Sequence, residues 1–465
     1  MELIFSVLWL SPFLIAVLLV LGSFVAVIGA CNDFRVGLWV TVTAFVLDAV
    51  SMSGPVLNLG MTIYAADLPM VLVALAAAIR WAGAADMPRR HLAWFLFALA
   101  FLSSFALGLL RYGSAAGVQA RPDFYALAAA SYALAFPIER PQLRAMLVAL
   151  AWAAVAIALL SLYRWVVYLT PIASLLPPGG VYNIDGPMRV VNSNNALLLA
   201  QVALVGVFFF GSGLAPVLAR LAAPALLMAT LALQHRSVWL AGLVGACTSV
   251  LAARGSRTPW WQQVLLVGIA AAAVAAPLMF SKTLSGQVQS SATRAVQGEG
   301  TVTARFDNWE VTLAQWVGGG PVSVAVGSPP GGDKTRVYYT ENGQKVVVNF
   351  STHNNYVHVL TSQGLLGLVT WCWVLVVGLL GLWRLRQARE ESAEAASMLL
   401  VLLCTQLAYY VAYDVDYLQA FILGTALAWV FQRQRQPAVP AGSVAPAPAE
   451  PGRGLHGAQG LQAGM

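Results

Sequence analysis

Four arginines stand where they could hold an anionic group. Arg189 precedes an apolar run, and Arg236 lies in the polar turn Gln-His-Arg-Ser between two apolar runs. Arg294 and Arg305 lie in the longest polar stretch of the chain. A guanidinium group carries a rigid fork of donors that matches the oxygens of a phosphate or pyrophosphate. One such arginine could as readily contact a lipid headgroup or a carboxylate, so only several converging in space would indicate a phosphate site.

His353 is the second candidate for chemistry. It stands where the polar stretch ends and the next apolar run begins, followed by Asn354 and Tyr356. A neutral imidazole at a membrane boundary could accept the proton of a sugar hydroxyl, with these two neighbours in support. His358, five residues on, would face away from His353 if both are helical. Taken alone, His353 would be interpreted as a residue that merely starts a helix.

The run from His353 to Gly367 fits a longer pattern. It reads His-[Asn/Ser/Gln], nine residues, Gly, two residues, Gly, and Asn354, Gly364 and Gly367 fill the later positions. This pattern resembles the one that marks the O-antigen ligase superfamily. Three upstream segments are similar to that family in the same order along the chain.

The first of these segments, Arg189 to Ala196, is similar to an Arg-to-Asn-Ala segment of the family but lacks the usual Asn-Pro-Asn. The second, Arg236-Ser237, resembles a Ser-Arg segment with the order reversed. The third joins Arg305 and Trp309 to a Gly/Pro stretch ending in Val-Gly-Ser-Pro, and resembles the loop that precedes the histidine. The resemblance covers about residues 185–370.

This resemblance implies an inverting, metal-independent glycosyltransferase of the cell envelope. Such enzymes take a glycan from undecaprenyl pyrophosphate and join it to lipid A–core, to a growing polysaccharide or, in some branches, to a protein. Since the leaving group is already a pyrophosphate, no nucleotide or other cofactor is needed. The expected catalytic residues are His353, as general base, with Arg236 and Arg305 on the pyrophosphate. The expected substrate-binding residues are Arg189, Arg294, Asn354 and Tyr356.

Composition predicts where such an enzyme works. Of 465 residues, 59% are hydrophobic and only 10% are charged, so lipid must cover much of the surface. The net charge of +7 does not indicate nucleic acid, because the basic residues stand at the ends of apolar runs. The four cysteines lack the spacing of a metal site or a disulfide framework. The sequence therefore predicts an integral membrane protein with the bilayer as its surroundings and without a metal site.

The apolar runs predict an all-α fold with about 12–13 transmembrane helices over residues 1–435, because a bilayer core takes roughly 20 apolar residues per helix. The expected spans are 3–29, 36–52, 67–82, 91–110, 123–137, 144–168, 191–211, 215–233, 237–253, 262–280, 356–382, 397–412 and 417–432. One large loop covers 281–352, and the Pro/Ala/Gly-rich tail 436–465 is expected to be disordered.

Arginine placement predicts the orientation. If the spans alternate, one side holds Arg80, Arg89, Arg90, Arg140, Arg144, Arg220, Arg254, Arg257, Arg384, Arg386, Arg389, Arg433 and Arg435. The positive-inside rule makes that side cytoplasmic. The tail is then cytoplasmic, and the loop 281–352 and the candidate site face the periplasm of a bacterial inner membrane. The remaining arginines, which include Arg111, Arg121, Arg164 and Arg336, need another explanation than topology.

The loop has an internal pattern. Residues 305–315 predict an amphipathic helix with Phe306, Trp309 and Leu313 on one stripe, and 337–339 with 346–350 predict a hairpin. The Gly/Pro cluster 318–332 predicts turns rather than helix.

Four acids border apolar runs. We expect structural roles for Asp48 and Asp67, whereas Asp414 and Asp416 could be counter-ions of the arginines or structural.

Two other functions fit the sequence. A polymerase of O-antigen or exopolysaccharide repeats would use the same donor and differ only in its acceptor. A transporter or flippase of lipid-linked glycans should instead show repeat symmetry and ionisable residues deep in several spans. The polar residues concentrate at one membrane surface, which favours an enzyme over a transporter.

Overall fold

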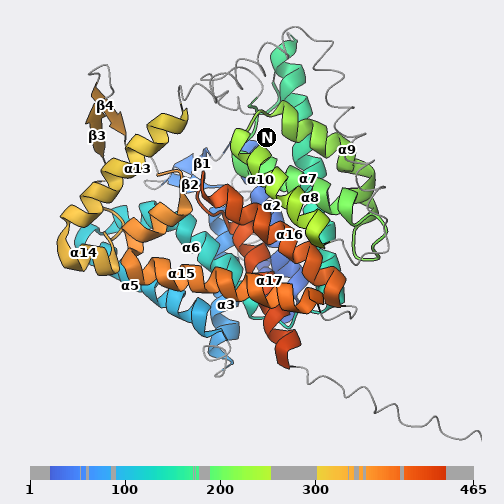
Figure 1. Cartoon of the computed structure of the whole chain (residues 1–465), viewed down its shortest axis with the longest axis horizontal. Coiled ribbons are helices and arrows are strands. Elements are labelled where there is room, and N and C mark those ends of the chain that lie inside the picture. The colour runs from blue at the N-terminus through green and yellow to red at the C-terminus, as the bar shows by residue number, and fades with distance from the viewer. Residues whose placement is uncertain are drawn as a thin grey trace, which may run out of the picture.

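A computed structural model shows a chain built almost entirely of helices (Figure 1). The structure describes residues 21–52, 54–58, 62–84, 91–170, 172, 174–176, 189–252, 301–333, 335–339, 345–348, 352–387 and 392–435. Its helices are α2 (Phe34–Ser51), α3 (Asp67–Ala82), α5 (Leu92–Tyr112), α6 (Ser114–Leu134), α7 (Arg140–Leu169), α8 (Ser193–Phe208), α9 (Val217–Ala232), α10 (Arg236–Ala252), α13 (Thr301–Gly318), α14 (Gly320–Val326), α15 (Asn355–Gln387), α16 (Ser392–Tyr410) and α17 (Tyr417–Arg435). Two antiparallel hairpins are formed by β1 (Pro55–Asn58) with β2 (Thr62–Tyr64) and by β3 (Arg336–Tyr339) with β4 (Lys345–Val348).

The helices have the length and composition of a membrane protein. Within the described residues, α2, α5, α7, α15 and α16 are long and apolar enough to cross a bilayer, and α8, α9 and α10 are shorter apolar helices. The predicted class, an all-α integral membrane protein, is confirmed. The span 262–280, most of the span 3–29, and the tail from residue 436 lie outside the described residues.

Arginine contacts between helix ends mark one of the two ends of the bundle. The guanidinium of Arg80 binds Cys31 O (2.6 Å) and Ala135 O (2.9 Å), which joins the ends of α3 and α6 to the start of α2. In the same way Arg140 pairs with Glu394 (3.8 Å), Arg220 binds Phe210 O (2.8 Å) and Arg386 binds Leu251 O (2.5 Å). We call this the basic end. The opposite end, which holds residues 189–193, 233–236, 352–356 and 409–417, is the site end.

The centre of the bundle is formed by α8, α16 and α17, which are buried along most of their length. Gln201 of α8 and Gln419 of α17 are completely buried and exchange two side-chain hydrogen bonds of 2.9 Å. Such pairing is required because a bilayer interior offers a polar group no water. The pair fixes α17 against α8, and α17 carries the turn that closes the site end.

One expected span differs from its helix. The sequence predicts 123–137, but α6 runs from Ser114 to Leu134 and contains Pro122. Its alanine-rich second half packs so closely on α17 that a Cβ on Gly424 would lie 2.4 Å from Ala130 O. Small residues allow such close packing, and they also weaken the apolar signal from which spans are predicted.

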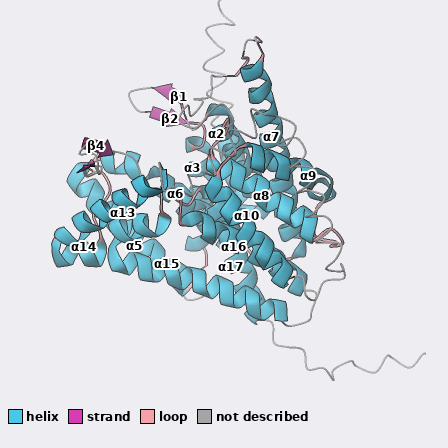
Figure 2. Ribbon diagram, turned by 45° about the horizontal axis from the view of Figure 1, so that its top comes forward, coloured by secondary structure: helices cyan, strands magenta, loops and turns pink. Residues whose placement is uncertain are grey.

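The second half of the large loop forms a separate group beside α5 and α15 (Figures 1 and 2). The predicted amphipathic helix is confirmed as α13, and the predicted hairpin as β3–β4. One expectation is wrong. The Gly/Pro cluster contains a short helix, α14, because Gly320 with its positive φ and Pro321 at the start of the helix suit a helix beginning. The rings of Phe306 and Trp309 lie 5.1 Å apart on one face of α13, as the predicted stripe requires, although Phe306 is exposed and α13 buries Asn308 and Thr312.

A kink divides α15. Gly364 has φ 70° and ψ −168° inside the helix, a conformation that is almost restricted to glycine. The kink lets α14 approach, and a Cβ on Gly364 would lie 2.3 Å from Ala325 O. The glycine at this position of the histidine pattern therefore has a steric reason.

We expect Gly364→Ala to lower the thermal stability of the detergent-solubilised protein. The backbone conformation alone costs about 1–3 kcal/mol for a residue with a Cβ, and the clash with Ala325 adds to it. The matched control is Gly117→Ala, because a Cβ on Gly117 meets nothing within 4 Å. Equal melting temperatures for wild type and Gly364→Ala would contradict the steric requirement for glycine at the kink.

Candidate active site

His353 is presented by the residues that start α15. Thr352 and Asn354 on either side are buried, whereas His353 is partly exposed and has a left-handed φ of 49°. Trp309 of α13 donates its indole N–H to Thr352 O (2.7 Å), which ties the loop helix to this point. A residue with a side chain is uncommon at such a φ, so the surrounding structure must hold the backbone of His353 in this conformation.

The ring of Tyr413 brings His353 and Arg305 together. The imidazole lies edge-on to this ring at a centroid distance of 5.8 Å. The Arg305 guanidinium carbon lies 5.0 Å from the centre of the same ring, a distance typical of cation–π contacts. Tyr413 belongs to the turn of residues 411–416 between α16 and α17. Two predicted catalytic residues that are 48 positions apart therefore share one aromatic neighbour.

A second tyrosine connects this group with the segment before α8. Tyr409 stacks on Tyr413 with a centroid distance of 4.9 Å and an interplanar angle of 14°. Its buried hydroxyl hydrogen-bonds Ser193 Oγ (2.7 Å) and Asn194 Oδ1. A continuous set of contacts therefore runs from His353 and Arg305 to the segment that contains Arg189.

Arg189 in turn lies at the turn that precedes α10. Its guanidinium donates to Gln234 O (3.3 Å), and the next side chain, His235, contacts Val191 O through Nε2 (3.0 Å). Arg236 is the first residue of α10 and is partly buried. These hydrogen bonds place Arg189 beside the turn that carries Arg236, although 46 residues separate the two in the sequence.

Burial determines the charge of His235. Burial lowers the pKa of this imidazole most, the positive charge of Arg189 lowers it further, and the hydrogen bond to Val191 raises it, so that the resulting pKa is about 4. His235 is therefore neutral at neutral pH, with its proton on the Nε2 that faces the Val191 carbonyl. The positive charge in this part of the site is carried by Arg189 and Arg236.

Residues 221–372 match the family model described as O-antigen ligase. The chain contains an O-antigen ligase domain. The superfamily recognised from the histidine pattern is thereby confirmed, and the ligase domain includes Arg236, Arg305, His353, Gly364 and Gly367. Arg189, Tyr409 and Tyr413 lie outside the matched range. No curated protein matches the chain.

Two predicted substrate-binding residues of the ligase domain have structural contacts. Asn354 caps α15, because its Oδ1 accepts the backbone N–H groups of Tyr356 (3.0 Å) and Val357 (3.1 Å). The Tyr356 hydroxyl donates to Leu407 O (3.2 Å) and joins α15 to α16. Both hold the segment that presents His353, and direct contact with a substrate stays a prediction for each. Arg294 lies outside the described residues.

Other arginines of the site end have structural partners. Arg164 is buried and donates to Ala49 O (3.0 Å), Val50 O (2.9 Å) and Val190 O (2.7 Å). A cation is favourable at the end of α2, where backbone carbonyls lack helical partners. Arg121 pairs with Asp67 (3.4 Å), which also accepts the Tyr64 N–H (2.8 Å). These contacts agree with the structural role expected for Asp67.

Asp416 stands at the end of the turn between α16 and α17. Asp416 caps α17 by accepting the Gln419 N–H at 2.9 Å. Burial raises the pKa of Asp416 to about 7, with a contribution from Asp48, whereas the amide hydrogen bonds of Gln419 and Leu418 lower it. Asp416 is therefore protonated in part at neutral pH. The cap at the start of α17 is a structural contact of Asp416.

The raised pKa of Asp416 predicts a pH dependence of stability. The unfolded carboxyl has a pKa of about 3.9, and the folded one about 7, so folding favours the protonated form. The stability from this group is complete below about pH 4 and is lost as the pH rises through about 7. We expect the melting temperature to fall between about pH 5 and pH 8 more steeply in wild type than in Asp416→Asn. Equal slopes in the two proteins would contradict the assignment.

Several residues of the candidate site were not predicted from the sequence. Tyr409 and Tyr413 lie in a run of four tyrosines and two aspartates between 409 and 417. This density of polar groups at the end of a span could have indicated a site.

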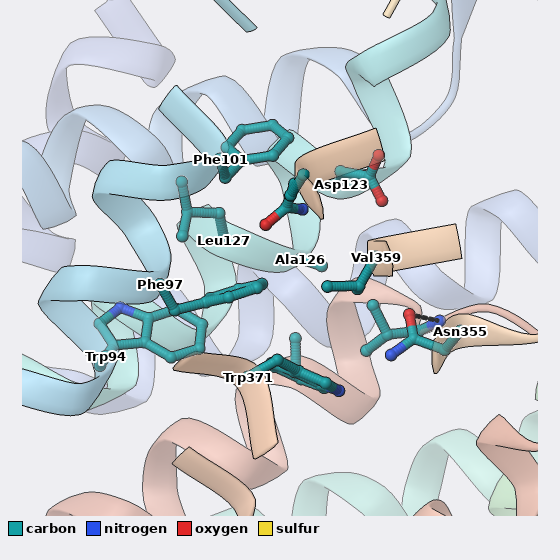
Figure 3. A pocket seen from close by; sticks show the side chains of 12 residues that line it. Trp94, Phe97, Phe101, Asp123, Ala126, Leu127, Asn355, Val359 and Trp371 are labelled. Atoms are coloured by element: carbon teal, nitrogen blue, oxygen red, sulfur yellow. Dashed lines mark hydrogen bonds between the residues drawn. The ribbon is translucent and has the colours of Figure 1, made fainter. Parts of the chain in front are cut away.

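The pair of His358 and Asp123 was also not predicted. Their Nε2 and Oδ2 atoms are 3.0 Å apart. Asp123 lines a small pocket with Asn355 and Trp371 between α5, α6 and α15 (Figure 3). The pair braces the first turns of α15 against α6.

Proposed function

We propose that the protein transfers a glycan from undecaprenyl pyrophosphate to an acceptor sugar, lipid A–core, at the periplasmic face of the inner membrane. The observation that carries this proposal is the shared contact of His353 and Arg305 with the ring of Tyr413. A base and a phosphate-binding cation are the two groups that such a transfer requires. The O-antigen ligase domain supports this class of activity.

In the proposed reaction the acceptor hydroxyl oxygen attacks the anomeric carbon of the donor sugar. The bond from that carbon to the pyrophosphate oxygen breaks, and its electron pair leaves with undecaprenyl pyrophosphate. His353 takes the hydroxyl proton, and the guanidinium groups of Arg305, Arg236 and Arg189 stabilise the departing pyrophosphate. Attack opposite to the leaving group inverts the anomeric configuration. The arginines supply the required charge, so we propose a metal-independent reaction.

An apolar cavity supports a lipid-linked donor. It has a volume of about 230 Å³ and lies between α8, α9 and α10. On α10 its lining runs from Val238, two residues after Arg236, to Ala246. Ten helical residues correspond to about 15 Å. A polyprenyl chain in this cavity would place its pyrophosphate beside the turn with Arg189 and Arg236.

Gene deletion separates the acceptors. Loss of all O-antigen caps, single-unit caps included, with carrier-linked polymer accumulating would support a ligase. Lipopolysaccharide capped with one repeat only would indicate an O-antigen polymerase. Normal caps with loss of a secreted polysaccharide would indicate an exopolysaccharide polymerase. Gels of lipopolysaccharide and exopolysaccharide from the deletion strain and the complemented strain give all of these readouts.

A transporter of lipid-linked glycans is the alternative from another class. Purified protein in vesicles with donor and acceptor distinguishes the two, because an enzyme forms product without any movement across the bilayer. Absence of product together with flux of the lipid-linked glycan would overturn the enzymatic proposal.

A further inference from the structure

The basic end contains a cavity that the proposed reaction does not use. It has a volume of about 660 Å³ and lies between the starts of α2, α7 and α16 and the connection from α8 to α9. Its polar lining consists of Arg35, Arg140, Arg144 and Glu394. Three positive charges therefore face one negative charge, so the cavity favours an anion.

The side chains of the cavity differ from the other arginines of the basic end. Arg80, Arg220 and Arg386 donate to backbone carbonyls and hold helix ends together. Within the part of the chain that the structure describes, the guanidinium groups of Arg35 and Arg144 make no hydrogen bond or ion pair. Both are exposed at the cavity, where they can bind a ligand without breaking an internal contact.

An apolar groove continues from the same cavity. The groove has a volume of about 500 Å³ and shares Arg35 and Trp39 with the cavity. Its remaining lining is Val36, Val40, Thr43, Leu68, Pro69 and Leu72, on the surfaces of α2 and α3. Trp39 is 43% exposed and Leu68 48%, so the groove is open to the surrounding bilayer. Basic residues at headgroup depth beside an apolar groove match the two parts of a phospholipid.

We propose that this cavity and groove bind one anionic phospholipid. The phosphate lies among Arg35, Arg140 and Arg144, and an acyl chain follows the groove past Trp39. The bound lipid joins α2 to α7, and so connects parts of the basic end that are far apart in sequence. The site lies at the opposite end of the bundle from His353, and the proposal does not depend on the proposed transfer reaction.

Native mass spectrometry of the full chain in detergent tests the site. The probes are phosphatidylglycerol, the zwitterionic phosphatidylethanolamine, and glycerol 3-phosphate as a soluble phosphate. The variant is Arg35→Gln combined with Arg144→Gln, and the matched control is Arg220→Gln, a basic-end arginine outside the cavity. We expect the double variant to bind phosphatidylglycerol at least tenfold more weakly than wild type and control.

Several outcomes would overturn the proposal. Equal binding of phosphatidylglycerol to the double variant and wild type would place the lipid elsewhere. Binding of glycerol 3-phosphate as tight as that of phosphatidylglycerol would indicate a soluble anion instead of a lipid, and equal binding of phosphatidylethanolamine would remove the role of charge. Wild-type-like melting of the lipid-free double variant verifies its fold. If that variant unfolds, Arg35→Lys with Arg144→Lys takes its place, and it should bind at intermediate strength because charge remains but the guanidinium fork is lost.

Discussion

Replacing Arg305 by alanine should lower the rate of glycan transfer by about 10²–10³-fold, the typical cost of removing one charged donor from a transition state. The guanidinium lies against the Tyr413 ring, 5.0 Å from its centre, at the end of the bundle that also carries Arg189 and Arg236. Because the departing pyrophosphate gains negative charge as the bond breaks, loss of this cation raises the barrier. We expect a similar loss for Arg236→Ala. Transfer by purified protein with lipid-linked donor and acceptor measures both.

Two further variants make the Arg305 result specific. Arg305→Lys should retain intermediate activity, because it keeps the charge but loses the fork of donors. Arg111→Ala removes an exposed arginine from the end of α5 and should transfer at the wild-type rate. Retention of most transfer activity by correctly inserted Arg305→Ala protein would remove Arg305 from the proposed role.

Loss of the imidazole in His353→Gln should lower the turnover rate by about 10²–10⁴-fold, the usual contribution of a general base. Glutamine keeps much of the size and polarity of histidine at the contact with Tyr413 but cannot accept the proton of the acceptor hydroxyl. The effect should therefore appear in kcat rather than in KM for the acceptor. Steady-state kinetics over a range of acceptor concentrations measures the two separately.

His358→Gln is the matched comparison for His353. His358 lies one turn into α15 and contacts Asp123, and a glutamine amide can keep that hydrogen bond. We expect this variant to transfer at near the wild-type rate. If His353→Gln instead raised KM with an unchanged kcat, His353 would bind the acceptor and another group would take the proton.

The sequence predicts those parts of this molecule that depend on local pattern. Apolar runs of about 20 residues give the helices because a bilayer admits little else. The spacing from His353 to Gly367 predicts the ligase domain, and the structure adds a reason for Gly364, whose φ of 70° lets α14 approach. The start of α6 could not be predicted, because alanine and Pro122 weaken the apolar signal there.

The contacts that assemble the site depend on residues far apart in the chain. Tyr413 meets His353 and Arg305 only because α16 and α17 pack beside α15, and no local spacing records that packing. Tyr409 reaches Asn194 across more than 200 positions for the same reason. The charged groups could be predicted because their residue types indicate their chemistry. The tyrosine rings between them could not, because only the packing of distant helices brings them to the site.

The position of Tyr413 has a consequence for experiments with hybrid proteins. The ring belongs to a turn that begins some forty residues after the matched domain ends. A chimera that received residues 221–372 from a relative would obtain Arg305 and His353 from one parent. Tyr413, which contacts both side chains, would come from the other parent. Such hybrids should be active only when the matched domain and the helices α16 and α17 come from the same parent. The smallest exchangeable unit therefore reaches from before α8 to the end of α17.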